Sequence, residues 1–263
     1  SNPKMRETFA RELHELIRQK PHIGVYGICP NDGYGWCECE KCAALDTPED
    51  RKNKQVNGRV ADFAADICAR MEKSDPTAYI GHYSYSNFAD FADHLKVLPK
   101  NLVVSFTQFH CYRHAMNDPS CPKNKPQWER MNKLLSKTGN LYIYDYYSHN
   151  WNGMPASIWK TVGDDFKAWR KLNIHGFLSE APGAENSSWD SFWPVFYTAA
   201  QMMWNADNEP DVLMQDWCRA RYGLAAEPMT AYFRQLESSL YAGNACFLKA
   251  PDDLRLLLPP ITL

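Results

Sequence analysis

The stretch HIGVYGICPNDGYGWCECEKC, residues 22–42, joins a short apolar run to a loop rich in polar side chains. The apolar run at 22–28 is typical of a buried strand. The loop directly after it carries Asn31, Asp32, Trp36 and three closely spaced cysteines. In α/β folds, side chains at the carboxyl end of a parallel strand often form the active site. The stretch therefore predicts a strand of an α/β sheet, followed by a loop that carries chemistry.

Outward from this stretch, short apolar strands alternate with amphipathic helices. The patterns predict strands at 22–28, 78–83, 102–109, 141–147 and 176–179, and helices at 4–19, 56–72, 128–135 and 158–172. Further helical patterns lie at 189–204, 209–222 and 228–241, and 254–263 is expected to be a tail. Strands that alternate with helices in this way indicate a parallel α/β architecture.

The number of strands limits the choice of architecture. A closed (β/α)8 barrel needs eight strands and about 250 residues, so five strands cannot close one. The chain is therefore either an open doubly wound sheet or the second part of a barrel whose first three strands lie upstream. It contains no glycine-rich phosphate loop, which removes the main reason to expect a nucleotide-binding open sheet.

Composition excludes some classes of partner. The net charge is −2 and charges of both signs are mixed along the 263 residues, so we expect no nucleic-acid partner. No apolar stretch approaches the roughly 20 residues of a membrane span, and residues 1–20 are too charged for a signal peptide. Aromatic residues make up 13% of the chain, and aromatic side chains on loops suit the apolar faces of sugar rings.

Polar and aromatic side chains follow each of the five predicted strands. Asp32, Asp145 and Glu180 are candidates for acid–base chemistry, because glycosidic cleavage needs a proton donor and a second carboxylate. Asp32 could instead belong to an Asn-Asp-Gly turn, and Asp145 could be a hydrogen-bond anchor at a strand end. The candidates for binding substrate are Asn31, Trp36, His82, Tyr83, His110, Tyr146, Trp151 and Trp189.

The nine cysteines divide by spacing. Cys37, Cys39 and Cys42 suit thiolates that converge on one tetrahedral Zn²⁺ better than they suit a disulfide. Such a structural Zn²⁺ needs a fourth ligand, for which we predict Cys121, with Cys29, Cys111 or a nearby His as alternatives. In an oxidising compartment, Cys37 or Cys42 could instead pair with Cys111 or Cys121, and free thiols are the third possibility. The cysteines in helical patterns, expected in the core, are Cys68, Cys218 and Cys246.

Several of these motifs resemble a known enzyme family. The strand at 22–28 followed by Asn31 and Asp32 resembles the part of family 20 glycoside hydrolases, the β-N-acetylhexosaminidases, where a strand reading H-x-G-G-D-E delivers the catalytic pair. The stretch 176–204, with Glu180, resembles the last strand of that family, its sugar-binding Glu and the helix after it. The run at 142–147 resembles the segment where the family keeps a Tyr and an Asp near the substrate.

A second resemblance is more specific. The motif N-D-G-x-G-W-C-x-C-x-x-C, the segment from Cys111 to Cys121 and the helix end at 222–223 resemble an uncharacterised group of bacterial domains. That group is regarded as distantly similar to family 20 and to the family 67 α-glucuronidases. The resemblance covers residues 5–223 and implies an α/β fold of the (β/α)8 TIM-barrel type with strands four to eight. The expected domains are a partial barrel at 1–205 and C-terminal helices at 206–263 that pack on it.

The resemblance implies a glycoside hydrolase-like domain that hydrolyses O-glycosidic bonds in a glycan. Asp32 would be the general acid, Asp145 or Glu180 the second carboxylate, and catalysis would need no cofactor. Asn31 stands where the hexosaminidases have an Asp and cannot supply its charge, so we expect a conventional mechanism. The alternatives are a degenerate barrel that binds carbohydrate without turnover and a zinc-stabilised interaction domain without a sugar site.

The same resemblance bears on partners and location. Part of a barrel would expose strand edges, so we expect self-association or an upstream part of the same protein, besides the carbohydrate. The sequence does not state a location. A periplasmic or secreted bacterial location follows if the glycosidase interpretation holds.

Overall fold

The computed structural model of the chain describes residues 2–91, 95–108, 111–147, 157–181, 189–242 and 246. The chain divides into two compact units. The first unit holds residues 1–107 and 130–143, and the second holds residues 108–129 and 144–263. The predicted domain boundary at 205/206 falls inside the second unit.

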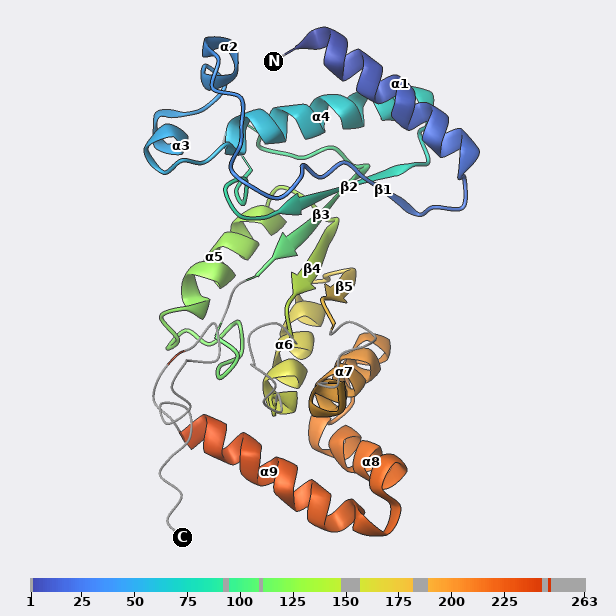
Figure 1. Ribbon diagram of the computed structural model, residues 1–263, viewed down its shortest axis with the longest axis vertical. Helices are drawn as coiled ribbons and strands as arrows, with labels where there is room; N and C mark the ends of the chain where they lie inside the picture. Colours follow the sequence, from blue (N-terminus) through green and yellow to red (C-terminus); the bar gives the residue numbers. More distant parts are fainter. Residues whose placement is uncertain are drawn as a thin grey trace. The chain divides into compact units, whose positions relative to one another are not determined.

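Five strands form one sheet in the order β1-β2-β3-β4-β5 (Figure 1). They are β1 Val25–Gly27, β2 Tyr79–Ser84, β3 Leu102–Thr107, β4 Leu141–Asp145 and β5 Gly176–Ser179. β1 pairs with β2 in parallel, and β2 pairs with β3 in parallel. Backbone hydrogen bonds from Val104 to Asn140 and from Gln108 to Tyr144 continue the parallel register to β4. Parallel strands in chain order, with helices in three of the four connections among the described residues, match part of a (β/α)8 barrel, which confirms the predicted fold class.

In the first unit, two long helices pack together. They are α1 Pro3–Gln19 and α4 Asn57–Ser74 (Figure 1), and the rings of Phe9 and Phe63 meet edge to face at 5.2 Å between them. Asn2 caps α1, because its side chain accepts the backbone N–H of Met5. The short helices α2 Glu40–Ala43 and α3 Pro48–Lys52 lie between β1 and α4 in the sequence. Neither of these two helices was predicted.

Side chains of the strands alternate between two faces, as the pleat requires. On β2, Ile80, His82 and Ser84 are buried, whereas Tyr79 on the other face is 47% exposed. On β4, Asp145 is buried on the same face as Leu141 and Ile143, whereas Tyr144 is only partly buried. This alternation decides which polar residue of a strand reaches solvent.

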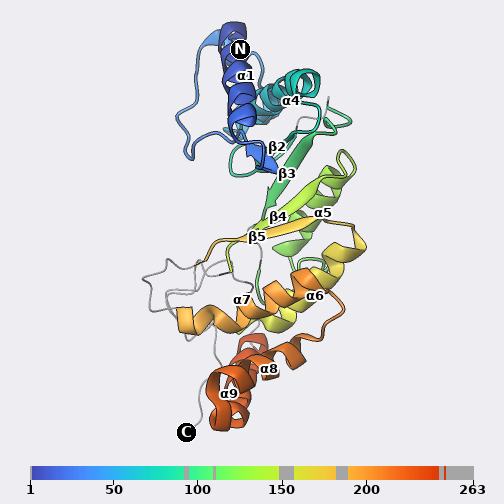
Figure 2. The same ribbon diagram turned by 90° about the vertical axis from the view of Figure 1, so that its right-hand side faces the viewer.

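The helices α6 Trp159–Lys171, α7 Trp189–Trp204, α8 Pro210–Tyr222 and α9 Ala226–Ala242 belong to the second unit (Figure 2). The helix α5, Asn124–Leu135, connects β3 to β4 along the chain. Trp159 of α6, Trp217 of α8 and Phe233 of α9 share one buried cluster. The start of α6 is capped by α9, because the Lys160 N–H donates to the Glu237 carboxylate at 2.9 Å.

All the predicted strands and helices are present, and each observed end lies within four residues of its predicted position. Gly223 ends α8 at φ 54°, as predicted, since this left-handed backbone favours glycine. Cys68 and Cys218 are buried in helices as predicted, but Cys246 is not in a helix because α9 ends at Ala242. The predicted tail at 254–263 lies outside the described residues.

None of the helices in the described ranges combines the length and the apolar character that a membrane span requires.

Candidate functional site

The loop after β1 carries Asn31 and Asp32 on the surface of the first unit. Both side chains are exposed, and Gly33 follows with φ 128°, which ends the turn. The predicted acid Asp32 is therefore accessible to a substrate.

Trp36 fixes the same loop to the first unit. Its ring is partly buried against the cluster of Val56, Val60 and Phe88, and it meets the ring of Phe88 edge to face at 5.9 Å. This packing makes Trp36 an anchor of the loop. A sugar ring could stack only on the part of the indole that stays accessible.

His82 and Tyr83, two predicted substrate ligands, point to opposite faces of β2. His82 is 3% exposed and lies between the rings of Phe88 and Phe91, at centroid distances of 5.7 and 6.0 Å. Burial lowers the pKa of His82 to about 4, so the ring is neutral near pH 7. Tyr83 is partly buried and packs against the cluster of Val56, Val60 and Phe88.

A cavity of about 310 Å³ lies in the first unit beside this loop. Its lining is mostly apolar and comes from α1, α4 and the loop, with His82 of β2. Two buried nitrogen atoms of the lining residues, Nε1 of Trp36 and Nδ1 of His82, make no hydrogen bond to the described residues. The cavity could therefore hold an apolar group that offers one or two polar atoms.

Cys37, Cys39 and Cys42 come together in the first unit, with sulfur atoms within 4.8 Å of one another. Cys39 precedes the first turn of α2, and its carbonyl accepts the N–H of Cys42 at 3.0 Å. Arg59 of α4 supports the loop by donating to the Cys37 carbonyl at 2.6 Å and to Asp46 at 2.8 Å. Three thiolates so placed could hold one metal ion as three of its four ligands.

In the second unit, Asp145 ends β4 as a completely buried carboxylate. It accepts hydrogen bonds from the Tyr112 hydroxyl at 2.7 Å, from the backbone N–H of Tyr146 at 2.6 Å and from the Gln108 amide. Burial, together with the charge of Asp145, raises the pKa of Tyr112 well above its ordinary value, so this hydroxyl keeps its proton. Asp145 therefore anchors the loop after β3, which agrees with the alternative prediction that it is a hydrogen-bond anchor at the end of a strand.

Glu180 lies differently, on the more open face at the end of β5. It is partly buried, its backbone N–H donates to the Asp145 carbonyl at 3.0 Å, and its Oε1 accepts the Tyr144 hydroxyl at 2.6 Å. The ring of Tyr146 meets that of Tyr144 edge to face at 5.1 Å. Glu180, Tyr144 and Tyr146 form one group, which we call the Glu180 group.

Sequence reasoning did not select Tyr144, Tyr112 or Gln108. The signal for Tyr144 was present, because in a strand it shares a face with Tyr142 and not with the apolar Leu141 and Ile143. No sequence signal joins Gln108 and Tyr112 to Asp145, since they lie more than thirty residues away in the chain.

Cys121, the predicted fourth ligand of the metal, lies in the second unit. There it is grouped with Cys111, His114 and Cys246, and the first unit holds the other three predicted ligands. His110 and Trp151 lie outside the described residues, and Trp189 is the first residue of α7.

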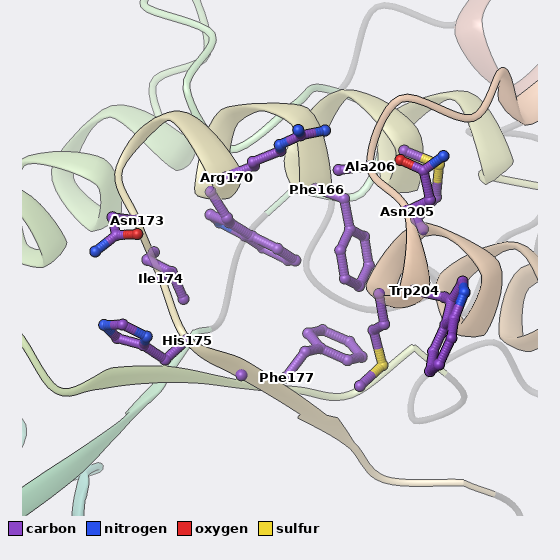
Figure 3. A pocket seen from close by; sticks show the side chains of 13 residues that line it. Phe166, Arg170, Asn173, Ile174, His175, Phe177, Trp204, Asn205 and Ala206 are labelled. Atoms are coloured by element: carbon purple, nitrogen blue, oxygen red, sulfur yellow. The ribbon is translucent and has the colours of Figure 1, made fainter.

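Another pocket, of about 340 Å³, lies in the second unit at the amino end of β5 (Figure 3). Its lining includes His175 just before β5, Phe177 of β5, Phe166 and Arg170 of α6, and Trp204 at the end of α7. None of the predicted site residues lines it. In barrel folds this end of the strands serves stability, and the opposite end carries the chemistry.

A family model described as "Domain of unknown function (DUF4838)" matches residues 1–235, so the chain belongs to this family. None of the curated proteins matches the chain. The family description states no activity, and the resemblance to family 20 hydrolases stays a prediction from the residues.

Proposed function

We propose that this DUF4838 domain is a glycoside hydrolase-like barrel domain that hydrolyses O-glycosidic bonds in a glycan, with Asp32 as general acid and Glu180 as second carboxylate. The observation that carries the proposal is the Glu180 group, in which the partly exposed carboxylate accepts the hydroxyl of the partly exposed Tyr144. Tyr146, a predicted substrate ligand, is only 7% exposed and supports Tyr144 from the buried side. A carboxylate for the anomeric centre and an aromatic face for the sugar ring are what glycan cleavage uses. The group follows the carboxyl ends of β4 and β5, where barrel enzymes hold their active sites.

The contrast between Asp145 and Glu180 supports Glu180 as the second carboxylate. Asp145 is fully buried and accepts hydrogen bonds from Gln108, Tyr112 and Tyr146, so a substrate cannot reach it without breaking that network. Glu180 is partly exposed, and Tyr144 holds its Oε1 in place. We therefore assign Asp145 a positioning role in the loop after β3.

The proposed reaction follows from these roles. Asp32 gives its proton to the glycosidic oxygen as the bond from that oxygen to the anomeric carbon breaks. Glu180 either forms a bond to the anomeric carbon, which water later hydrolyses, or removes a proton from an attacking water.

The test is hydrolysis of a panel of aryl glycosides and bacterial, plant and host glycans by the full-length protein, measured as release of new reducing ends. With the best substrate, Glu180→Gln should lower kcat by about 10²–10⁴-fold, the usual contribution of an acid or base. Glu38→Gln is a matched control, because Glu38 is an exposed carboxylate in the loop after β1. Equal rates for Glu180→Gln and Glu38→Gln would remove Glu180 from the mechanism.

A second candidate function is glycan binding without turnover. It is favoured by Asn31, an amide where the resembled hydrolases have a carboxylate, and by the hydrogen bond that engages Glu180 with Tyr144. This candidate predicts binding on a glycan array, no release of reducing ends, and binding that survives Asp32→Asn but weakens in Tyr144→Ala, which removes the partly exposed ring beside Glu180. Turnover by the wild-type protein would exclude it.

A further inference from the structure

Four metal-ligating side chains meet in the second unit, away from the residues proposed for catalysis. Cys111, His114 and Cys121 come from the segment before α5, and Cys246 comes from the segment after α9. Cys111 Sγ lies 3.3 Å from His114 Nδ1, Cys246 Sγ lies 3.8 Å from the same nitrogen, and the sulfur atoms of Cys121 and Cys246 are 3.4 Å apart. All four ligand atoms lie within 4.8 Å of one another.

These distances fit the edges of one tetrahedral site. With Zn–S bonds of about 2.3 Å and a Zn–N bond of about 2.0–2.1 Å, tetrahedral angles give ligand–ligand distances of about 3.5–3.8 Å. The separations of 3.3, 3.4 and 3.8 Å between these side chains lie around that range. Three of the six ligand–ligand edges are therefore within a few tenths of an ångström of the ideal, and the other three are at most 4.8 Å long.

Hydrogen bonds with Asn124 fix the backbone at Cys111 and His114 without a bound metal ion. Asn124 is fully buried, and its side-chain oxygen accepts the Cys111 N–H at 2.5 Å. Its side-chain nitrogen donates to the carbonyl groups of Cys111, His114 and Ala115 at 2.8–3.1 Å. Such outer contacts orient metal ligands and limit the entropy lost on binding.

Charge and burial suit a structural ion. Three thiolates and a neutral imidazole around Zn²⁺ leave a net charge of −1, and Arg113, which is 4% exposed, lies close enough to interact with Cys111 and Cys246. Cys111 and Cys121 are buried, and His114 and Cys246 are partly buried. Four protein ligands complete a tetrahedron and leave no position for a substrate, which is typical of structural zinc sites.

A disulfide between Cys121 and Cys246 is the competing arrangement. Their sulfur atoms are 3.4 Å apart, longer than the roughly 2.05 Å of a disulfide bond, and such a bond would use neither Cys111 nor His114. The convergence of all four side chains favours the ion.

We propose that Cys111, His114, Cys121 and Cys246 bind one structural Zn²⁺, which ties the segment after α9 to the segment before α5 and needs none of Cys37, Cys39 and Cys42.

The test is titration of the reduced full-length protein with Co²⁺, whose ligand-field absorption reports tetrahedral thiolate coordination, followed by displacement with Zn²⁺. The titration uses a protein that carries the three substitutions Cys37→Ser, Cys39→Ser and Cys42→Ser. These remove the cysteine cluster of the first unit, so that it cannot bind the added metal. We expect this variant to bind one equivalent of Co²⁺ with tetrahedral absorption, and Zn²⁺ to displace it.

In that background, His114→Ala or Cys246→Ser should weaken binding by more than about 100-fold, beyond the loss expected for an outer contact. His114→Cys should restore a tetrahedral spectrum with a stronger thiolate contribution. Circular dichroism checks the fold of each variant. Because Cys246 lies beyond the last described helix, we expect Cys246→Ser to disturb the fold least. A triple variant that binds no Co²⁺, or a spectrum unchanged by both His114→Ala and Cys246→Ser, would overturn the proposal.

Discussion

Asp145 accepts hydrogen bonds from three donors, so we expect its replacement to lower the stability of the protein. Asp145→Asn keeps the size of the side chain but replaces one carboxylate oxygen by an NH₂ group, which cannot accept a hydrogen bond. The remaining amide oxygen is a weaker acceptor for the donors of Gln108, Tyr112 and the Tyr146 N–H. Each buried polar group left without its partner costs about 1–3 kcal/mol. We expect a lower free energy of unfolding by at least that amount, measured by urea denaturation. Asp32→Asn, at an exposed position, should leave it unchanged, and equal stabilities of the two variants would contradict the anchor role.

His82 predicts a dependence of stability on pH. Its pKa is about 4 in the folded protein and near 6.5 in the unfolded chain, so the unfolded chain binds more protons between these values. The stability contribution of neutral His82 is complete above pH 6.5 and is lost as the pH falls to 4. Since one pKa unit corresponds to about 1.4 kcal/mol, the loss reaches about 3 kcal/mol.

The measurement is urea unfolding of the wild type and of His82→Phe at several pH values between 7 and 4. The variant should lose less stability on acidification, because a Phe among Phe88 and Phe91 has nothing to titrate. Replacement of the exposed His22 by Gln serves as the control and should not alter the slope. Parallel pH profiles for wild type and His82→Phe would show that His82 is not buried as a neutral ring.

The sequence allowed the strand-end residues to be predicted but not their environments. Asp145 ends β4 and Glu180 follows β5, yet Asp145 is a buried anchor whereas Glu180 is accessible. The alternation of Leu141, Ile143 and Asp145 on one face was readable from the sequence. The donors to Asp145 were not, because they come from a distant part of the chain.

At the scale of elements, the close packing of α6 against α8 can be tested at one glycine. A Cβ added to Gly163 would overlap the ring of Pro210, a rigid neighbour at the start of α8. Gly163→Ala should lower the free energy of unfolding by about 1–3 kcal/mol, although alanine is favoured over glycine in helices by about 1 kcal/mol. Gly139→Ala, which meets open space, is the matched control in denaturant titrations. A Gly163→Ala protein as stable as wild type would contradict this packing.

Long helices were predictable and short helices were not. The helices with a continuous apolar face were predicted near their observed ends, whereas α2 and α3 are too short to show a period. The start of α3 nevertheless carries a signal, since Thr47 and Asp50 form a reciprocal capping box. Cys246 was predicted in the core because the helical pattern seemed to extend to it, but the helix ends before it.

At the scale of the whole molecule, the regular alternation of strands and helices was enough to predict a parallel α/β sheet, whereas the choice of a partial barrel over an open doubly wound sheet came from the family resemblance. Each βα unit is local in sequence, and crossover connections between parallel strands leave few choices of order. The division into two units was not predictable, because the second unit takes residues 108–129 from between stretches of the first. The cluster of Cys111, His114, Cys121 and Cys246 could not be predicted from the sequence either, since Cys246 lies 125 residues from Cys121 in the chain.

Cleavage of a glycan by Asp32 and Glu180 is tested most directly by comparing kcat of the full-length wild type, Asp32→Asn and Glu38→Gln on the same substrate. A general acid contributes about 10²–10⁴-fold, so Asp32→Asn should lose turnover by that factor while its unfolding curve and the rate of Glu38→Gln stay at wild-type values. Full turnover by Asp32→Asn, or release of no reducing ends by the wild type on any glycan that it binds, would contradict the proposed hydrolysis.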